Sequence, residues 1–245
     1  MLTEEELKRD NQRDVDVFNS RKYPTKNGID CPFCHNKGFV GRLIDGEPYY
    51  TSCICTKDHE AVNNAISSGL GEYLKLSMQD FKAAYSFQST MKQKALNFLK
   101  NPDRHWFVAL GKNGTGKTTL TAIIANSLLK DGKRVLYKTW PELVHDCDVD
   151  YYKVKNTLKQ WQTVEVLFID DFLKGSLSDR ALQYAYELLN YRYNHKLITL
   201  ISSAKIITEI QEIDKALGSR IMEMTGKNHD FLINNRPDTS QNQRL

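Results

Sequence analysis

The fold is decided by residues 111–118, which read Gly-Lys-Asn-Gly-Thr-Gly-Lys-Thr. They match the spacing G-x-x-x-x-G-K-[ST] of a phosphate-binding loop, and they stand between an apolar run at 106–110 and a helix-forming stretch at 118–130. Glycines let the backbone curl so that successive N–H groups point at phosphate oxygens, and the following helix adds positive potential at its N-terminus. The stretch predicts a strand, a nucleotide-binding loop and a helix; the alternative is a glycine-rich turn that matches by chance.

Each residue type in this loop has an expected partner in ATP or magnesium. Lys117 would bridge the β- and γ-phosphates, and the Thr118 hydroxyl would coordinate Mg²⁺. The residues expected to bind the nucleotide are Gly111, Asn113, Gly114, Thr115, Gly116, Lys117, Thr118 and Thr119.

A second apolar run, at 166–169, ends in the acid pair Asp170-Asp171. Ligands of a parallel sheet bind at the carboxyl ends of its strands, so these acids are expected to face the loop. Asp170 would hold Mg²⁺ through water, and Asp171 would polarise the attacking water. Because Asp is one methylene shorter than Glu, we expect slow hydrolysis. The alternative is an acidic strand end without a catalytic role.

Helical and apolar stretches alternate through the larger, C-terminal part of the chain. Strands are expected at 106–110, 134–138, 164–169, 197–201 and near Phe231, and helices at 91–100, 118–130, within 141–161, at 178–193 and from 208 to about 224. This alternation is typical of an α/β fold with a parallel sheet and helices on both faces. We expect a module over 1–74, an ATPase domain over 75–234 and a disordered tail over 235–245.

Composition excludes several classes of protein. The chain has 245 residues, 40% of them hydrophobic, and a net charge of +4. Its apolar runs fall far short of the ~20 residues that a membrane helix needs, and residues 1–8 lack the apolar core of a signal peptide. We expect a cytoplasmic protein. The basic excess lies outside residues 1–60, and it fits either solvated lysines or a phosphate-facing surface.

Four of the five cysteines lie between positions 31 and 55. The pairs Cys31-x-x-Cys34 and Cys53-x-Cys55 offer four thiolates for a tetrahedral zinc site, with short strands expected at 38–41 and 47–51 as in a zinc ribbon. Zn²⁺ would supply most of this unit's folding energy.

Alternatives to that zinc site stay open. His35 or His59 could replace one thiolate, and the cluster could be an iron–sulfur site, a redox pair or buried inert thiols. The fifth cysteine, Cys147, is expected to be a packing residue.

The order of these motifs resembles the AAA+ ATPases, and more closely the DnaC/DnaI-type replicative helicase loaders, particularly their phage-encoded relatives. The resemblance covers about 75–233 and rests on four stretches, at 110–119, 168–175, 184–201 and 217–224. It implies an AAA+ fold and a DNA replication protein that hydrolyses ATP. It further implies loading of a hexameric replicative helicase onto single-stranded DNA, with the N-terminal module gripping the helicase.

The same resemblance assigns two further residues. Many loaders have a sensor Asn where this chain has Ala204, so the sensor is Ser203 or Ser202, or is lost. Arg220 is similar to the arginine finger that reaches the γ-phosphate of a neighbouring subunit, which implies self-association; the alternative is a surface or helix-capping Arg. Because 25 residues follow Arg220, no C-terminal lid domain is expected.

Two other functions remain open. One is an ATPase helper of a DNA transposase, against which the cysteine-rich block argues. The other is a non-hydrolysing adaptor in which ATP only orders a binding surface. Phe172, Lys174 and Arg180 could face single-stranded DNA or be solvated helix-entry residues.

Overall fold

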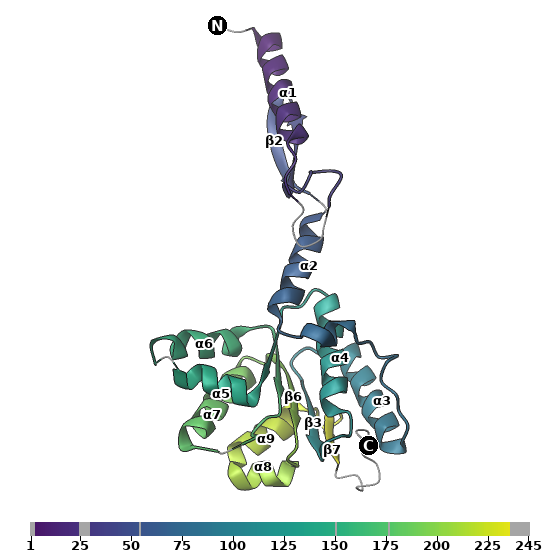
Figure 1. Cartoon of the computed structure of the whole chain (residues 1–245), viewed down its shortest axis with the longest axis vertical. Coiled ribbons are helices and arrows are strands. Elements are labelled where there is room, and N and C mark those ends of the chain that lie inside the picture. The colour runs from purple at the N-terminus through teal and green to yellow at the C-terminus, as the bar shows by residue number, and fades with distance from the viewer. Residues whose placement is uncertain (1–2, 25–29, 54, 150, 176, 236–245) are drawn as a thin grey trace. The chain divides into compact units, whose positions relative to one another are not determined.

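The structure, a computed structural model, describes residues 3–24, 30–53, 55–149, 151–175 and 177–235. The chain divides into two compact units, Met1–Asn64 and Ala65–Leu245 (Figure 1). This boundary falls within α2 (Cys55–Ser67) and lies earlier than the expected one at 74/75. The physical reason is that Leu70, Leu74 and Leu76 pack into the core of the second unit. Of the expected tail, Asn235 belongs to a strand and the remainder lies outside the described residues.

The second unit is built on a five-stranded parallel sheet. Its strands are β3 (Trp106–Gly111), β4 (Val135–Thr139), β5 (Val166–Asp170), β6 (Ile198–Ser203) and β7 (Leu232–Asn235), in the order β4-β5-β6-β3-β7. Its helices are η1 (Gly71–Lys75), α3 (Ser86–Lys100), α4 (Lys117–Lys130), α5 (Trp140–Val149), α6 (Tyr151–Thr163), α7 (Asp179–Asn194), α8 (Ile207–Ile213) and α9 (Lys215–Met224).

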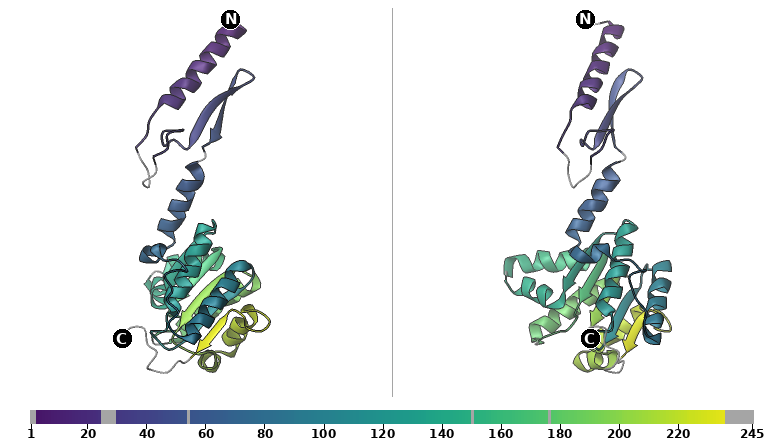
Figure 2. Two further views of the ribbon diagram at one scale, coloured as in Figure 1. Left: turned by 90° about the vertical axis from the view of Figure 1, so that its right-hand side faces the viewer. Right: turned by 45° about the vertical axis from the view of Figure 1, so that its right-hand side comes forward.

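Helices cover both faces of this sheet, as the sequence predicts (Figure 2). Along β3, Val108 joins the core cluster formed with α5 to α9, whereas Phe107 and Ala109 join the cluster formed with α3 and α4. The strands are apolar without interruption because successive side chains point to opposite faces and both faces are buried. The helices within the described residues are too short or too polar to span a bilayer.

Two expected helices are each divided in the structure. The stretch expected within 141–161 forms α5 and α6, and the stretch from 208 to 224 forms α8 and α9. Asp214 explains the second division, because its side chain accepts a hydrogen bond from the amide of Leu217 at 2.9 Å and so caps the start of α9.

The strand order brings the predicted site residues to one edge of the sheet. β5 pairs with β6 and β6 with β3, with Leu110 opposite Ser203. The carboxyl ends of these three parallel strands therefore meet beside the loop that follows β3. On its other side β3 pairs with β7, and Gly111 lies opposite Asn235.

Arg192 on α7 is completely buried and joins three elements. Its guanidinium donates to the hydroxyl of Thr199 and to the carbonyl oxygens of Trp161, Gln162, Val164, Glu165 and Ile198. Several of these carbonyls are at or just beyond the C-terminus of α6, where helical partners are lacking. Burial lowers the pKa of Arg192 to about 9.

The first unit contains α1 (Glu4–Ser20) and an antiparallel hairpin of β1 (Phe39–Ile44) and β2 (Glu47–Ser52). A capping box begins α1: the side chains of Thr3 and Glu6 each accept a hydrogen bond from the other residue's backbone amide. Phe18 packs edge-on against Tyr50, with ring centroids 4.6 Å apart. Asn19 donates to the carbonyl of Gly41 at 2.8 Å and accepts from its amide at 2.9 Å. Helix α1 is thus fastened to one face of the hairpin.

Candidate nucleotide-binding site and cysteine cluster

The loop after β3 and the end of β5 enclose a cavity of about 410 Å³. Its lining residues are Tyr73, Asn113, Gly114, Gly116, Lys117, Thr118, Thr119, Asp170, Asp171 and Lys174. Most of the residues expected to bind nucleotide are among them. Gly111 and Thr115 instead support the loop. The amide of Gly111 donates to the carbonyl of Lys205 at 3.0 Å, and the Thr115 hydroxyl donates to the carbonyl of Lys112 at 3.2 Å.

The loop backbone has the conformation that a phosphate cradle requires. Gly114 and Gly116 have φ values of 82° and 92°, in the left-handed region that glycine adopts without a steric penalty. Gly116 is also the N-cap of α4, so the unpaired amides at the start of this helix lie at the cavity. The Lys117 ammonium group donates to the Lys112 carbonyl at 2.7 Å and is held inside the loop.

Three hydroxyl groups converge on the carboxylate of Asp170. Thr118 donates to Oδ1 at 2.9 Å, Ser202 donates to the same oxygen, and Tyr137 on β4 lies 3.4 Å from Oδ2. Burial, and then the negative charge of Asp170, raises the pKa of the Tyr137 hydroxyl, which therefore remains a proton donor. Asp170 is thus oriented beside Thr118, as expected for two groups on one magnesium ion.

Asp171 lies next to this cluster in a left-handed conformation, with φ of 54°. Its amide donates to Ser202 Oγ at 3.3 Å, and its carboxylate forms an ion pair with Lys174 at 2.7 Å. Both side chains line the cavity. Lys174 therefore competes with any water molecule for the Asp171 carboxylate.

The two sensor candidates point in different directions because neighbouring strand residues face opposite sides. Ser203 donates to the carbonyl of Phe172 at 2.6 Å and accepts from the amide of Lys205, away from Asp170. Ser202 contacts Asp170 directly. Of the two sensor candidates, the geometry therefore favours Ser202 over Ser203.

Arg220 lies on α9 and is not among the residues that line the cavity of its own chain. Its guanidinium lies over the ring of Tyr186, 4.8 Å from the centroid, and donates to the Tyr186 hydroxyl at 3.3 Å. Its Nε is buried and has no hydrogen-bond partner among the described residues. The structure thus places Arg220 on the surface of α7 and α9, apart from the residues expected to act with it.

The three residues that could face single-stranded DNA, Phe172, Lys174 and Arg180, are not all exposed. Phe172 is 1% exposed and packs edge-on against Trp140 at 5.1 Å. Arg180 is 68% exposed, 3.7 Å from Asp148. Phe172 therefore cannot stack on a base without leaving the core.

The four clustered cysteines come together in the first unit, with their sulfur atoms all within 4.8 Å of one another. Cys31 and Cys53 are 3.7 Å apart, and Cys34 and Cys55 are 3.5 Å apart. A tetrahedral Zn–S₄ site with bonds of about 2.3 Å has sulfur atoms about 3.8 Å apart, so the residues fit zinc.

The backbone around the cysteines supports the same interpretation. Burial raises the pKa of Cys34, but hydrogen bonds from the Gly38 amide and neighbouring thiols outweigh it and lower this pKa to about 7. Among the described residues, His35 is not part of the cluster, and the side chain of His59 lies outside them. Cys147 is 1% exposed in the core of the second unit, as expected for a packing residue.

Two site residues were not expected from the sequence. Tyr73 on η1 lines the cavity, and Tyr137 contacts both Asp170 and the ring of Tyr73, whose centroid is 5.7 Å away. Neither belongs to the two motifs. In the sequence, the one indication that Tyr137 could reach the site is its position near the carboxyl end of β4, which pairs with β5.

Fold and site together define a P-loop ATP-binding protein of the AAA+ class. The family described as "IstB-like ATP binding protein" matches residues 68–229. The chain therefore belongs to the IstB/DnaC-like family of AAA+ ATPases.

Relatives and solved structures agree with this family. The chain is 33% identical over 217 residues to the Bacillus subtilis (strain 168) protein YqaM, covering 81% of this chain and 68% of YqaM. It is 30% identical over 222 residues to the phage-like element PBSX protein XkdC of the same organism, covering 83% and 81%. The structure of DnaI matches with a TM-score of 0.54 and 25% identity, covering 62% of this chain and 86% of DnaI.

The structure of the DnaC helicase loader has a TM-score of 0.52 and 22% identity, covering 65% of this chain and 92% of that one. At this identity the likeness concerns the fold. The AAA+ fold predicted from the sequence is confirmed.

Proposed function

We propose that this chain is an ATPase that loads a hexameric replicative helicase onto single-stranded DNA. The observation that carries the proposal is the convergence of Lys117, Thr118, Asp170 and Asp171 on one cavity, in a chain that is 25% identical to DnaI. A protein of this kind acts in the cytoplasm of a bacterium or a phage-infected host.

Within this proposal, each site residue has one task. The amides of the loop and the Lys117 ammonium bind the phosphates of ATP, while Thr118 and Asp170 hold magnesium. Bound Mg²⁺ neutralises charge that develops on the phosphates. Ser202 and Tyr137 orient the Asp170 carboxylate, and Asp171 orients the attacking water.

Hydrolysis is expected to be slow in the isolated chain. Lys174 forms an ion pair with the Asp171 carboxylate, and Arg220 does not line the cavity of its own chain. Arg220 would complete the site of a neighbouring copy and stabilise charge there. Assembly, or binding to single-stranded DNA, would therefore increase turnover.

The N-terminal unit, residues 1–64, would bind the helicase, and the second unit, which begins at residue 65, would form the ATPase. Cys31, Cys34, Cys53 and Cys55 would hold Zn²⁺, which stabilises the module. The division of the chain into two compact units supports this division of tasks.

ATP turnover of the purified chain, with and without single-stranded DNA, tests the ATPase. Lys117→Ala should abolish turnover, whereas Lys112→Ala changes an exposed side chain of the same loop and should have little effect. A Lys117→Ala variant as active as the wild type would remove the ATPase proposal.

Association with a purified hexameric replicative helicase tests the loader. The wild type should be retained by the immobilised helicase, and Cys31→Ser/Cys34→Ser should not. Absence of association in every nucleotide state would exclude helicase loading.

Mixing two inactive variants tests the role of Arg220. Arg220→Ala retains an intact loop, and Lys117→Ala retains an intact Arg220. If Arg220 acts in a neighbouring copy, the mixture should recover part of the ATP turnover that each variant lacks. No recovery, or an active Arg220→Ala variant, would contradict this role.

A non-hydrolysing adaptor is the second candidate. The Asp171–Lys174 ion pair and the serine at the sensor position favour it. ATP binding without turnover under every condition, including DNA and helicase, would support the adaptor. A transposase helper would instead stimulate strand transfer by a partner transposase and would not bind the helicase.

A further inference from the structure

Two aromatic rings are exposed beside the cysteine cluster. Phe33, between Cys31 and Cys34, is 65% exposed, and Tyr23 is 52% exposed. Their rings face solvent although both residues belong to a unit with a small core. Exposed aromatic rings of this kind are available to stack on the rings of a ligand.

The backbone that carries these rings is firmly held. The Tyr23 amide donates to the carbonyl of His35 at 3.0 Å, and the Asn36 side chain donates to the Tyr23 carbonyl at 3.0 Å while accepting from the Cys31 amide. Tyr23 is therefore tied to the turn that carries Phe33. Because the backbone is already ordered, stacking on these rings costs little further conformational entropy.

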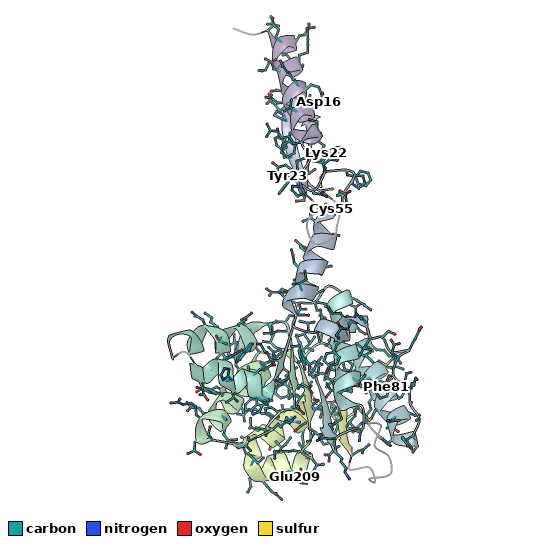
Figure 3. All side chains as sticks on the ribbon, viewed as in Figure 1. Asp16, Lys22, Tyr23, Cys55, Phe81 and Glu209 are labelled. Carbon is teal, nitrogen blue, oxygen red and sulfur yellow. The ribbon has the colours of Figure 1, made fainter. Side chains whose placement is uncertain are left out.

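The charge of this part of the unit differs from that of the rest. Residues 21–44 contain five basic and one acidic side chain, whereas residues 1–20 contain three basic and six acidic ones. Arg21, Lys22 and Arg42 are exposed, and no ion pair is found for them among the described residues. Arg42 also lies opposite Tyr49, which is 53% exposed. Figure 3 shows Lys22 and Tyr23 at the same end of the unit as Cys55.

We propose that Tyr23 and Phe33, together with Arg21, Lys22 and Arg42, form a contact surface for single-stranded DNA, here called the knuckle surface. Unpaired bases stack on aromatic rings irrespective of sequence, and unpartnered cations neutralise the phosphates between them. The inference extends the proposed function, in which single-stranded DNA is a partner, by assigning a DNA contact to the cysteine unit.

The acidic helix α1 limits the surface to one part of the unit. Its first turn contains Glu4, Glu5 and Glu6, which repel a phosphate backbone. Leu7 on the same helix is 46% exposed but has no aromatic ring and lies among these acids. It provides a matched control for removing exposed apolar surface.

Fluorescence anisotropy of a labelled oligothymidine with the full, zinc-loaded chain tests the proposal. Phe33→Ala and Tyr23→Ala should each weaken binding by roughly 5- to 150-fold, the range for one lost stacking contact. Phe33→Trp should retain wild-type affinity, and so should Leu7→Ala. A duplex of the same length should bind more weakly, because its bases cannot stack on protein.

The salt dependence gives an independent readout of the cations. Each phosphate contact contributes about −0.7 to the slope of log K against log salt for a single strand. Lys22→Gln should therefore make the slope less steep by about 0.7. Equal zinc content of all variants shows that the cysteine unit remains folded.

Unchanged DNA affinity in both Phe33→Ala and Tyr23→Ala would overturn the proposal. If these variants keep their DNA affinity and lose helicase binding, the knuckle surface is a protein-docking surface and the proposal is wrong. A chain that binds DNA through this surface but neither turns over ATP nor binds helicase would refute the proposed function and leave this inference standing.

Discussion

The carboxylate of Asp170 accepts from Thr118 and Ser202 on one oxygen and lies near Tyr137 on the other. A buried carboxylate with this many hydroxyl partners is held in one orientation. It is therefore already oriented before a metal binds. Its neighbour Asp171 is held by Lys174 in a different way, through an ion pair that is partly exposed to solvent. The two adjacent acids therefore differ in how easily each can be reoriented.

Ser202 and Ser203 should respond differently to substitution by alanine. Ser202→Ala removes a group on Asp170 and should lower kcat by about 10-fold or more without a large change in stability. Ser203→Ala removes the donor to the Phe172 carbonyl and should lower the free energy of unfolding by about 1–2 kcal/mol. Parallel turnover assays and urea titrations measure both. A larger loss of kcat in Ser203→Ala would show that the sensor is Ser203.

Tyr137 should influence the response to magnesium. Tyr137→Phe keeps the ring that packs on Phe168 and removes only the hydroxyl beside Asp170. We expect the Mg²⁺ concentration for half-maximal turnover to rise about 10-fold, while ATP binding measured without Mg²⁺ stays unchanged. An unchanged magnesium response would mean that this hydroxyl only fills space.

At the scale of elements, Arg192 is the side chain that holds α6, α7 and β6 together. Its donors reach the carbonyls at the end of α6 as well as Thr199 and Ile198 of β6. A single charged side chain in an apolar core is tolerated because its donors are used by fixed acceptors. The carbonyl groups at the C-terminus of α6 thereby gain hydrogen-bond donors without a glycine cap.

Arg192→Met should therefore be strongly destabilising. Methionine fills similar volume but leaves several buried carbonyl groups without donors, and we expect the free energy of unfolding to fall by about 3 kcal/mol or more. The matched control is Arg180→Met on the exposed face of α7, with an expected loss of about 0.5 kcal/mol or less. Equal losses in the two variants, measured by urea unfolding, would contradict the capping role.

The elements themselves were largely predictable from the sequence. Alternating apolar strands and helices, the loop at 111–118 and the acid after β5 predict a parallel sheet and the position of the site, but not the order of the strands. What could not be predicted depends on contacts between distant segments. The division at Asp214, the direction of Ser202 and the contact of Tyr137 with Asp170 follow from register and packing, which local patterns do not specify.

At the scale of the whole molecule, the two compact units have cores of very different kinds. In the first unit, Val40 is the one partly buried apolar residue packed against the cysteine cluster within the described part of the chain, whereas the second unit has a large apolar cluster on each face of its sheet. The stability of the first unit is therefore expected to depend on the proposed zinc ion, and that of the second unit on apolar burial.

Removing the metal should unfold one unit and spare the other. After chelation of zinc, amide hydrogens at 31–52 should exchange rapidly, while those of β3 and β6 should keep their protection. Hydrogen exchange with mass spectrometry, beside a metal analysis of the same sample, makes this comparison. Chelation that leaves exchange at 31–52 unchanged, or a protein that never contained zinc, would exclude structural zinc.

The pairing of β7 with β3 affects how variants of the phosphate loop should be interpreted. At Gly111, where φ is 122°, an added Cβ would lie 1.6 Å from the carbonyl oxygen of Asn235. The collision is with the last strand of the sheet rather than with a nucleotide. An inactive Gly111→Ala protein would thus report a displaced edge of the sheet, and phosphate recognition is better probed at Lys117 and Thr118. In a mutational scan, the first glycine of this loop belongs with the determinants of folding.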